Sequence, residues 1–260
     1  MARVIGMGGY SVTTQQAARK PRHAVSRGTR RLTRSALALA GLAALLAIGF
    51  FSLSRAVGRG RTDDVDRRVL LAMREAGDLS DPIGPRWVEE VGRDMTALGG
   101  MAVLTLICGT AVAFFWLASM QRGAVYVGLA CFGAMLISSA LKQAFDRPRP
   151  DLVPHGSLVY TSSFPSGHSA MAATVYLTLG MVASRFVVRR RVKALFIAAA
   201  VGVTAAVGVS RVYLGVHWPT DVLGGWAVGA SWALLCWCAA VWLQDRRMIE
   251  QEDEASLATK

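Results

Sequence analysis

The sequence predicts an all-α protein, a bundle of six transmembrane helices with a short interfacial helix in its first outer loop. Of the 260 residues, 53% are hydrophobic and only 18% are charged, a balance that is unusual for a soluble domain. A helix rises about 1.5 Å per residue, so about 20 apolar residues cross a hydrocarbon core. Six runs approach or exceed that length: Ser35 to Ser54, Met95 to Gln121, Gly123 to Leu141, Ser169 to Ser184, Ala194 to Ser210, and Val222 to Gln244.

The distribution of charge predicts which ends of these helices face the cytoplasm. Residues 1–34 carry eight Arg or Lys and no acid, and the link from Arg185 to Lys193 carries five and no acid. The positive-inside rule places both segments in the cytoplasm. The segment from Arg55 to Asp94 has eight basic and nine acidic side chains and fits the outer side. We therefore expect a multi-pass protein of the cell inner or plasma membrane with both termini in the cytoplasm.

Residues 1–34 are rich in Gly, Ser, Thr and Arg without helical periodicity, which predicts a disordered basic arm before a six-span domain at residues 35–244. A cleaved signal peptide is the alternative, but the basic segment is too long and the apolar run too extended for one. Residues 245–260 are expected to form an acidic cytoplasmic tail. A nucleic-acid partner is not expected from the net charge of +12, because no aromatic residues interleave with the basic ones.

Four apolar residues of the first outer loop recur at helical spacing and predict the interfacial helix: Val65, Val69, Leu70 and Met73. Asp63, Asp64 and Asp66 lie at its start. They could hold a divalent cation, but acids in a first turn are ordinarily solvated and favoured by the helix dipole. No metal or other cofactor is therefore expected.

A basic segment from Lys142 to Pro150 ends the third apolar run. Its two prolines prevent a helix and hold the arginines in an extended conformation. In isolation, Lys142, Arg147 and Arg149 could be interfacial anchors. Arg147 is interpreted as a headgroup or loop contact.

A polar turn from Phe164 to Ser169 precedes the fourth apolar run. Pro165 and Gly167 interrupt the backbone and Ser166 is a favourable N-cap, so His168 should lie in the first turn of a helix. The N–H groups of such a turn bind anions. A simple helix start with a chance histidine is the alternative.

The expected topology brings the polar segments together. With a cytoplasmic N-terminus, the link from Lys142 to His168 and the link from Arg211 to Asp221 share the outer face. Two histidines and three cations around a helix N-terminus form a site for a phosphoryl group, because guanidinium groups match phosphate oxygens and lysine adds a point charge. Protein cations would stabilise the developing charge in place of a metal. For His217, an interfacial belt with its aromatic neighbours is the alternative.

These residues resemble the three-part signature of the type 2 phosphatidic acid phosphatase superfamily. The parts read Lys-x6-Arg-Pro, Pro-Ser-Gly-His and Ser-Arg-x5-His-x3-Asp, and all are complete and in order. In this sequence they are Lys142 with Arg149-Pro150, then Pro165 to His168, then Ser210-Arg211 with His217 and Asp221.

The resemblance implies a role for each signature residue. His217 is implied as the nucleophile that forms a phosphohistidine, His168 as the general acid and base, and Asp221 as the residue that orients His217. The implied phosphate-binding residues are Lys142, Arg149, Ser166, Gly167, Ser210 and Arg211.

The activity that follows from the resemblance is that of an integral membrane, metal-independent lipid phosphatase whose site faces away from the cytoplasm. Its substrate would be a lipid-linked phosphomonoester or pyrophosphate, such as a phospholipid phosphate or polyprenyl pyrophosphate, whose tail stays in the bilayer. Two alternatives remain: a phosphotransferase that uses another acceptor, and a non-catalytic protein that binds or transports lipid phosphates.

Overall fold

The computed structural model describes residues 22–152 and 161–257, and this part of the chain is almost entirely helical. The all-α class is confirmed, and a two-stranded antiparallel sheet that the sequence did not predict is added to it. The elements are α1 (Arg22–Gly58), α2 (Asp63–Leu71), β1 (Arg74–Glu75), β2 (Asp78–Pro82), α3 (Arg86–Ala97), α4 (Met101–Leu117), α5 (Gln121–Ala144), α6 (Gly167–Arg185), α7 (Arg190–Tyr213) and α8 (Pro219–Leu257).

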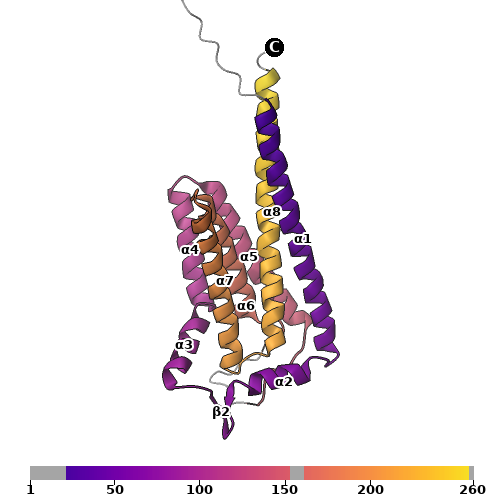
Figure 1. Cartoon of the computed structure of the whole chain (residues 1–260), viewed down its shortest axis with the longest axis vertical. Helices are drawn as coiled ribbons and strands as arrows, with labels where there is room; N and C mark the ends of the chain where they lie inside the picture. Colours follow the sequence, from indigo (N-terminus) through magenta and orange to yellow (C-terminus); the bar gives the residue numbers. More distant parts are fainter. Residues whose placement is uncertain (1–21, 153–160, 258–260) are drawn as a thin grey trace, which may run out of the picture.

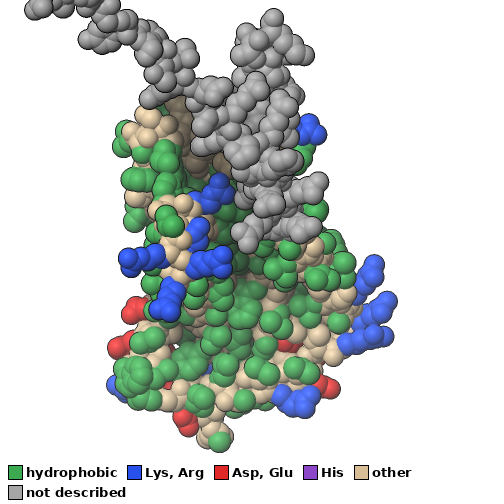
Figure 2. Space-filling view, turned by 45° about the horizontal axis from the view of Figure 1, so that its top comes forward, with side chains coloured by type: hydrophobic (Ala, Val, Ile, Leu, Met, Phe, Trp, Pro, Cys, Tyr) green, Lys and Arg blue, Asp and Glu red, His purple; other side chains and the backbone are tan. Residues whose placement is uncertain are grey.

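Within the described residues, four helices are long and apolar enough to cross a membrane, namely α1, α5, α7 and α8. A fifth crossing is counted if α3 and α4, which meet at 49°, form one broken span. Large apolar side chains remain exposed on the outside of the helices, among them Leu106, Leu117 and Leu195. Hydrophobic side chains also dominate the described surface in Figure 2. Such a surface is unfavourable in water, so the chain is a multi-pass membrane protein.

Helix α6 occupies the centre of the bundle, where α5, α7 and α8 pack around it, and α1 packs along α8 (Figure 1). Several of its polar side chains are fully buried, including Ser169, Thr174 and Thr178. The Thr174 hydroxyl lies 3.1 Å from the carbonyl oxygen of Gly229 in α8. Because protein surrounds α6, it does not need the apolar composition of a lipid-facing helix. This location explains why α6 is not among the helices whose length and mean hydropathy mark them as membrane spans.

Three boundaries differ from those expected. Helix α1 begins at Arg22, ahead of its apolar span at Ala36–Gly58, whereas residues 1–21 lie outside the described part. Helix α8 continues to Leu257 through the segment expected to be a separate tail. The second apolar run does not begin a helix at Met95, because α3 ends at Ala97 and α4 begins at Met101. In the first two cases an existing helix is extended, and adding residues to a helix costs much less free energy than nucleating a new one.

Figure 1 places α2, β2 and the start of α3 at one end of the bundle, and the beginning of α1 and the end of α8 at the other. Helix α2 covers the segment for which a short amphipathic helix was predicted. The links from α5 to α6 and from α7 to α8 also lie at the α2 end, so the polar motifs of the sequence gather there.

Close packing of α8 on α6 depends on glycine at position 229. A Cβ atom added there would lie 2.8 Å from the Cβ of Ala173 and even closer to the carbonyl oxygen of Ala170. We expect Gly229→Ala to lower the free energy of unfolding by about 1–3 kcal/mol, because the two helices must separate. Thermal unfolding of the purified protein in detergent should show a lower midpoint than wild type.

Gly202→Ala in α7 is the matched control, since a Cβ at Gly202 meets nothing within 4 Å. Its midpoint should equal or exceed that of wild type, because alanine has the higher helix propensity. Equal midpoints for the two variants would show that the α6–α8 contact tolerates a methyl group.

Candidate active site

All three parts of the signature meet at the α2 end of the bundle. The backbone N–H of Ser166 donates to the carbonyl oxygen of Asp221 at 2.9 Å. Arg149 donates through Nη1 to the carbonyl oxygen of Val216, also at 2.9 Å. The link that precedes α6 is therefore bonded directly to the link and the first turn that begin α8.

The imidazole of His217 is held between a carboxylate and a guanidinium. Its Nδ1 lies 3.4 Å from Oδ2 of Asp221, and its Nε2 lies 3.3 Å from Nη1 of Arg149. Arginine can only donate, so Nε2 accepts and the proton of the neutral ring lies on Nδ1, facing the carboxylate. Both neighbours thus favour the tautomer whose Nε2 lone pair faces the cationic side of the site.

Asp221 is completely buried in the first turn of α8 and has a full set of donors. Its Oδ2 accepts from the backbone N–H of Trp218 at 2.9 Å and from the hydroxyl of Ser163. Its Oδ1 accepts from Nη1 of Arg147 at 2.7 Å. Pro219 begins α8, and a proline at this position with a carboxylate in the first turn is favourable for a helix start.

Three cations line the site from three different elements. Lys142 lies in the last turn of α5, Arg149 lies in the following link, and Arg211 lies in the last turn of α7. Thr161 is a shared partner, because its hydroxyl lies 3.4 Å from both Lys142 Nζ and Arg149 Nη2. The three cations and His217 are all close enough to His168 to act on its charge. The two signature histidines therefore belong to one site.

Arg211 is only partly satisfied by protein groups. Its Nη1 donates to the hydroxyl of Thr96 at 2.9 Å, whereas its Nε is buried without a hydrogen-bond partner among the described residues. Buried donors of this kind are costly unless a ligand or water accepts from them. The guanidinium is thus suited to an anionic ligand.

The mouth of α6 has the predicted form. Ser166 is its N-cap, and the serine hydroxyl oxygen accepts from the backbone N–H of Ser169 at 3.5 Å and from the Ser169 hydroxyl at 3.0 Å. A Cβ atom at Gly167 would lie 3.4 Å from Nζ of Lys142, so glycine lets the ammonium group approach this helix end closely. The backbone N–H groups at the N-terminus of α6 and the Lys142 ammonium group can therefore act on the same bound anion.

Ser210 is placed differently from the other signature residues. Its buried hydroxyl donates to the carbonyl oxygen of Val207 within α7 at 2.7 Å. A serine inside a helix commonly satisfies itself in this way. The structure thus gives Ser210 a role in α7, and phosphate binding by this side chain stays a prediction.

Sequence reasoning missed several contributors. Ser163 bonds to Asp221 although no motif marks it. Asp66, expected to be a solvated carboxylate at a helix start, is fully buried and accepts from Thr220 and Arg147. Arg147 is a loop contact and not a headgroup contact, since its guanidinium is paired with Asp66 and Asp221. These pairings join segments that are distant in the chain, so no local pattern indicates them.

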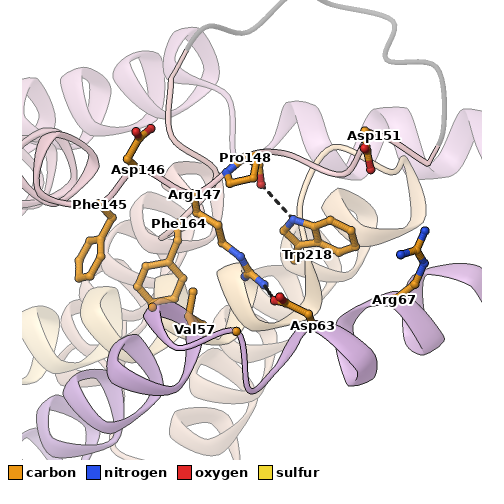
Figure 3. Close-up of a pocket in the computed structure, with 12 residues that line it drawn as sticks. Val57, Asp63, Arg67, Phe145, Asp146, Arg147, Pro148, Asp151, Phe164 and Trp218 are labelled. Atoms are coloured by element: carbon orange, nitrogen blue, oxygen red, sulfur yellow. Dashed lines mark hydrogen bonds and ion pairs between the residues drawn. The ribbon is translucent and has the colours of Figure 1, made fainter.

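A cavity of about 430 Å³ lies beside the site, between the end of α1, the start of α2 and the link after α5. Figure 3 shows that Arg147 crosses it toward Asp63 and that Trp218 closes one side, with its indole N–H donating to Pro148. Neither signature histidine lines this cavity. Its wall nevertheless includes the chain neighbours of His217 and Arg149.

Fold and site together define a class of protein: a multi-pass helical membrane protein that carries two histidines and three cations in one cluster at an end of its bundle. Comparison with known proteins gives the family. The profile of the PAP2 superfamily matches residues 123–245. The chain is 38% identical over 149 residues to phosphatidylglycerophosphatase B of Bacillus subtilis (strain 168), a match that covers 55% of this chain and 70% of that protein. The chain belongs to the PAP2 superfamily, as the signature indicated.

Two further similarities agree with this assignment. Over 183 residues the chain is 30% identical to the lipid A 1-phosphatase of Rhizobium etli, covering 59% of this chain and 74% of the relative. It also resembles the crystal structure of a transmembrane PAP2-type phosphatidylglycerolphosphate phosphatase from Bacillus subtilis. That match has a TM-score of 0.62 and 28% identity, and it covers 75% of this chain and 93% of the other.

Burial lowers the pKa of the His217 imidazole to about 4, an effect that the Asp221 carboxylate opposes and that Arg149 and Arg211 reinforce. The ring should therefore stay neutral at pH 5–7. In a protein with isotope-labelled histidine, NMR titration in micelles should give a His217 midpoint near 4, with His217→Gln used for assignment. A midpoint near the ordinary value of about 6.5 would contradict the burial of this ring.

Proposed function

We propose that this protein is an integral membrane lipid phosphatase that hydrolyses a lipid-linked phosphomonoester or pyrophosphate through a phosphohistidine on His217, without a metal. The observation that carries the proposal is the setting of His217. Its Nε2 lone pair faces Arg149, and Arg149, Arg211, Lys142 and His168 belong to the same cluster.

In the first step, Nε2 of His217 attacks phosphorus and the bond from phosphorus to the leaving oxygen breaks. His168 gives its proton to that oxygen, which leaves as a lipid alcohol or, from a pyrophosphate, as a lipid monophosphate. Asp221 stabilises the charge that develops on the His217 ring, because it already accepts from the Nδ1 side.

In the second step, water attacks the phosphorus of the phosphohistidine while His168 takes a proton from it. The phosphorus–nitrogen bond breaks, its electron pair returns to Nε2, and inorganic phosphate departs. Throughout, the cations Lys142, Arg149 and Arg211 hold the non-reacting oxygens, together with the N–H groups at the mouth of α6. We also assign a phosphate-binding role to Ser166, Gly167 and Ser210.

For the membrane we propose six crossings, in which α6 crosses inside the bundle and α4 with α3 forms one bent passage. Supporting this, the basic, acid-free segment from Arg185 to Lys193, the beginning of α1 and the end of α8 belong to the end of the bundle opposite the site (Figure 1). The positive-inside rule then puts the site on the extracytoplasmic face. There the headgroup of a lipid can reach the histidines while its tail remains in the bilayer.

The relatives support a lipid phosphate substrate but differ in which one. One is named a phosphatidylglycerophosphatase and another a lipid A 1-phosphatase. Both names describe the removal of phosphate from a membrane lipid, so we propose that chemistry for this chain. Phospholipid phosphates and polyprenyl pyrophosphate are the substrates to be compared.

The two histidines should separate into two kinetic roles. We expect His217→Ala to lower phosphate release from lipid phosphates by at least about 1,000-fold, since no nucleophile remains. His168→Ala should still form phosphohistidine from a substrate with a good leaving group, and should accumulate it because water is no longer deprotonated. The acid-labile, alkali-stable phosphoprotein can be measured with labelled substrate in detergent with a chelator present.

Arg93→Gln is the control, because Arg93 is exposed and, among the residues that the structure describes, pairs with Glu89 one turn away in α3 and with no other acid. It should hydrolyse lipid phosphate at the wild-type rate. Full activity of His217→Ala, or loss of wild-type activity on chelation, would disprove the mechanism. A protein that binds lipid phosphate but never releases inorganic phosphate would be a binding or transport protein.

A phosphotransferase is the remaining alternative, because the same phosphohistidine could pass its phosphoryl group to a lipid or sugar hydroxyl. We expect water to be the acceptor. When labelled lipid phosphate is supplied with candidate acceptors, the label should appear as inorganic phosphate. Label on the acceptor would identify a transferase.

A further inference from the structure

Arg147 joins two buried carboxylates, Asp66 and Asp221, from distant parts of the sequence. Its Nη1 donates to Oδ1 of Asp221 at 2.7 Å, and its Nη2 donates to Oδ2 of Asp66 at 2.7 Å. Both carboxylates are fully buried, and only 10% of the Arg147 side chain is exposed. Figure 3 shows this side chain reaching from the link after α5 toward α2. One planar guanidinium therefore connects α2 to the start of α8.

Thr220 completes the connection from the other side. Its backbone N–H donates to Oδ1 of Asp66 at 2.9 Å, and its hydroxyl donates to Oδ2 of Asp66 at 2.6 Å. The same hydroxyl also accepts from Nη1 of Arg147 at 2.8 Å. Asp66 thus fixes both the first turn of α8 and the arginine that holds Asp221.

We propose that Arg147 and Asp66 are positioning residues that set the orientation and the charge of the Asp221–His217 pair. This inference rests on the proposed function. Asp66 has no contact with His217, and its influence passes through Arg147 and Thr220. The outer segment that contains α2 thereby becomes part of the active-site framework.

Orientation is one part of the argument. Asp221 can hold the His217 ring only where its own carboxylate is held, and Arg147 fixes the oxygen that does not face the imidazole. Groups that support a catalytic side chain in this way commonly change activity by about 10–100-fold when removed. They do so without changing how substrate is bound, since they touch only the supporting residue.

The charge around the Asp221–His217 pair is the other part of the argument. The pair is faced by charged or titratable groups from every element around it: Arg147 and Arg149 in the link, His168 on α6, Arg211 on α7, Lys142 on α5, and Asp66 and Asp63 on α2 beyond Arg147. Removing the Arg147 charge makes the surroundings of His217 more negative and favours its protonation. Removing the Asp66 charge makes them more positive and disfavours it.

The experiment measures kcat, KM and their pH dependence for hydrolysis of a lipid phosphate by purified Arg147→Gln and Asp66→Asn proteins. Arg147→Gln should lower kcat by about 100-fold and Asp66→Asn by about tenfold, each with KM within about twofold of wild type. The acid limb, meaning the fall of kcat/KM on the acid side of its pH profile, reports protonation of His217. Its midpoint should move to higher pH by about one pH unit in Arg147→Gln and to lower pH in Asp66→Asn. A purely structural role would not move the limb in opposite directions.

Two further variants sharpen the test. Arg147→Lys keeps the positive charge but lacks the planar guanidinium that donates to both carboxylates. It should therefore restore the position of the acid limb but only part of kcat. The double variant should be slower than Arg147→Gln by less than the tenfold expected for Asp66→Asn alone, because part of the influence of Asp66 passes through Arg147 and the rest through Thr220. Arg93→Gln serves again as the control.

Wild-type kcat and an unmoved acid limb in Asp66→Asn would overturn this inference, even if Arg147→Gln fails to fold. Asparagine keeps the size of Asp66 and one of its two acceptor oxygens, and it removes the charge. Failure of the proposed function would be seen separately, as absence of hydrolysis by the wild-type protein. A raised KM with unchanged kcat in both variants would make Arg147 a substrate contact and also overturn the inference.

Discussion

A single buried carboxylate ties together the polar end of this protein. Asp221 receives a backbone N–H from its own helix start, a hydroxyl from the segment before α6 and a guanidinium from the link after α5. Its backbone carbonyl also accepts from the N-cap of α6. Burying a carboxylate without hydrogen-bond donors or a positive charge beside it would cost a large free energy. These segments must therefore be arranged so that their donors reach Asp221. The position of His217 follows from that requirement.

On the other side of the imidazole the balance of charge is reversed. Lys142, Arg149 and Arg211 bring three positive charges to a place where the described residues supply no acid except through Asp221. Mutual repulsion makes such a cluster unfavourable in an empty protein and favourable when an anion enters. The Asp221 carboxylate thus lies on one side of the His217 imidazole and the positive charges lie on the other, an arrangement suited to the proposed attack on a bound phosphoryl group.

Local features were predictable from the sequence. The N-cap at Ser166, the place of His168 in the first turn of a helix and the i, i+4 relation of His217 and Asp221 depend on residues a few positions apart, and each is present. The broken α3–α4 passage was not predicted, because an apolar run looks continuous even where Gly99 must lie against His168 and Val207. The Arg147–Asp66 pair joins residues 81 positions apart, and only the folding of α2 beneath the site brings them together. The hairpin after α2 likewise depends on tertiary contacts, since Arg74 in β1 donates to the carbonyl oxygen of Tyr213 at the end of α7.

The polar interior of α6 has a consequence for how the protein enters the bilayer. A segment that carries Ser169, Thr174 and Thr178 on faces closed off by neighbouring helices gains little by partitioning into lipid alone. In the proposed six-span layout, insertion of α6 must therefore be assisted by helices made before or after it, with α5 or α7 as the nearest partners in the chain. His168, in the first turn of α6, would reach the far side of the membrane only as part of that joint insertion, which links biogenesis of the protein to assembly of its polar cluster.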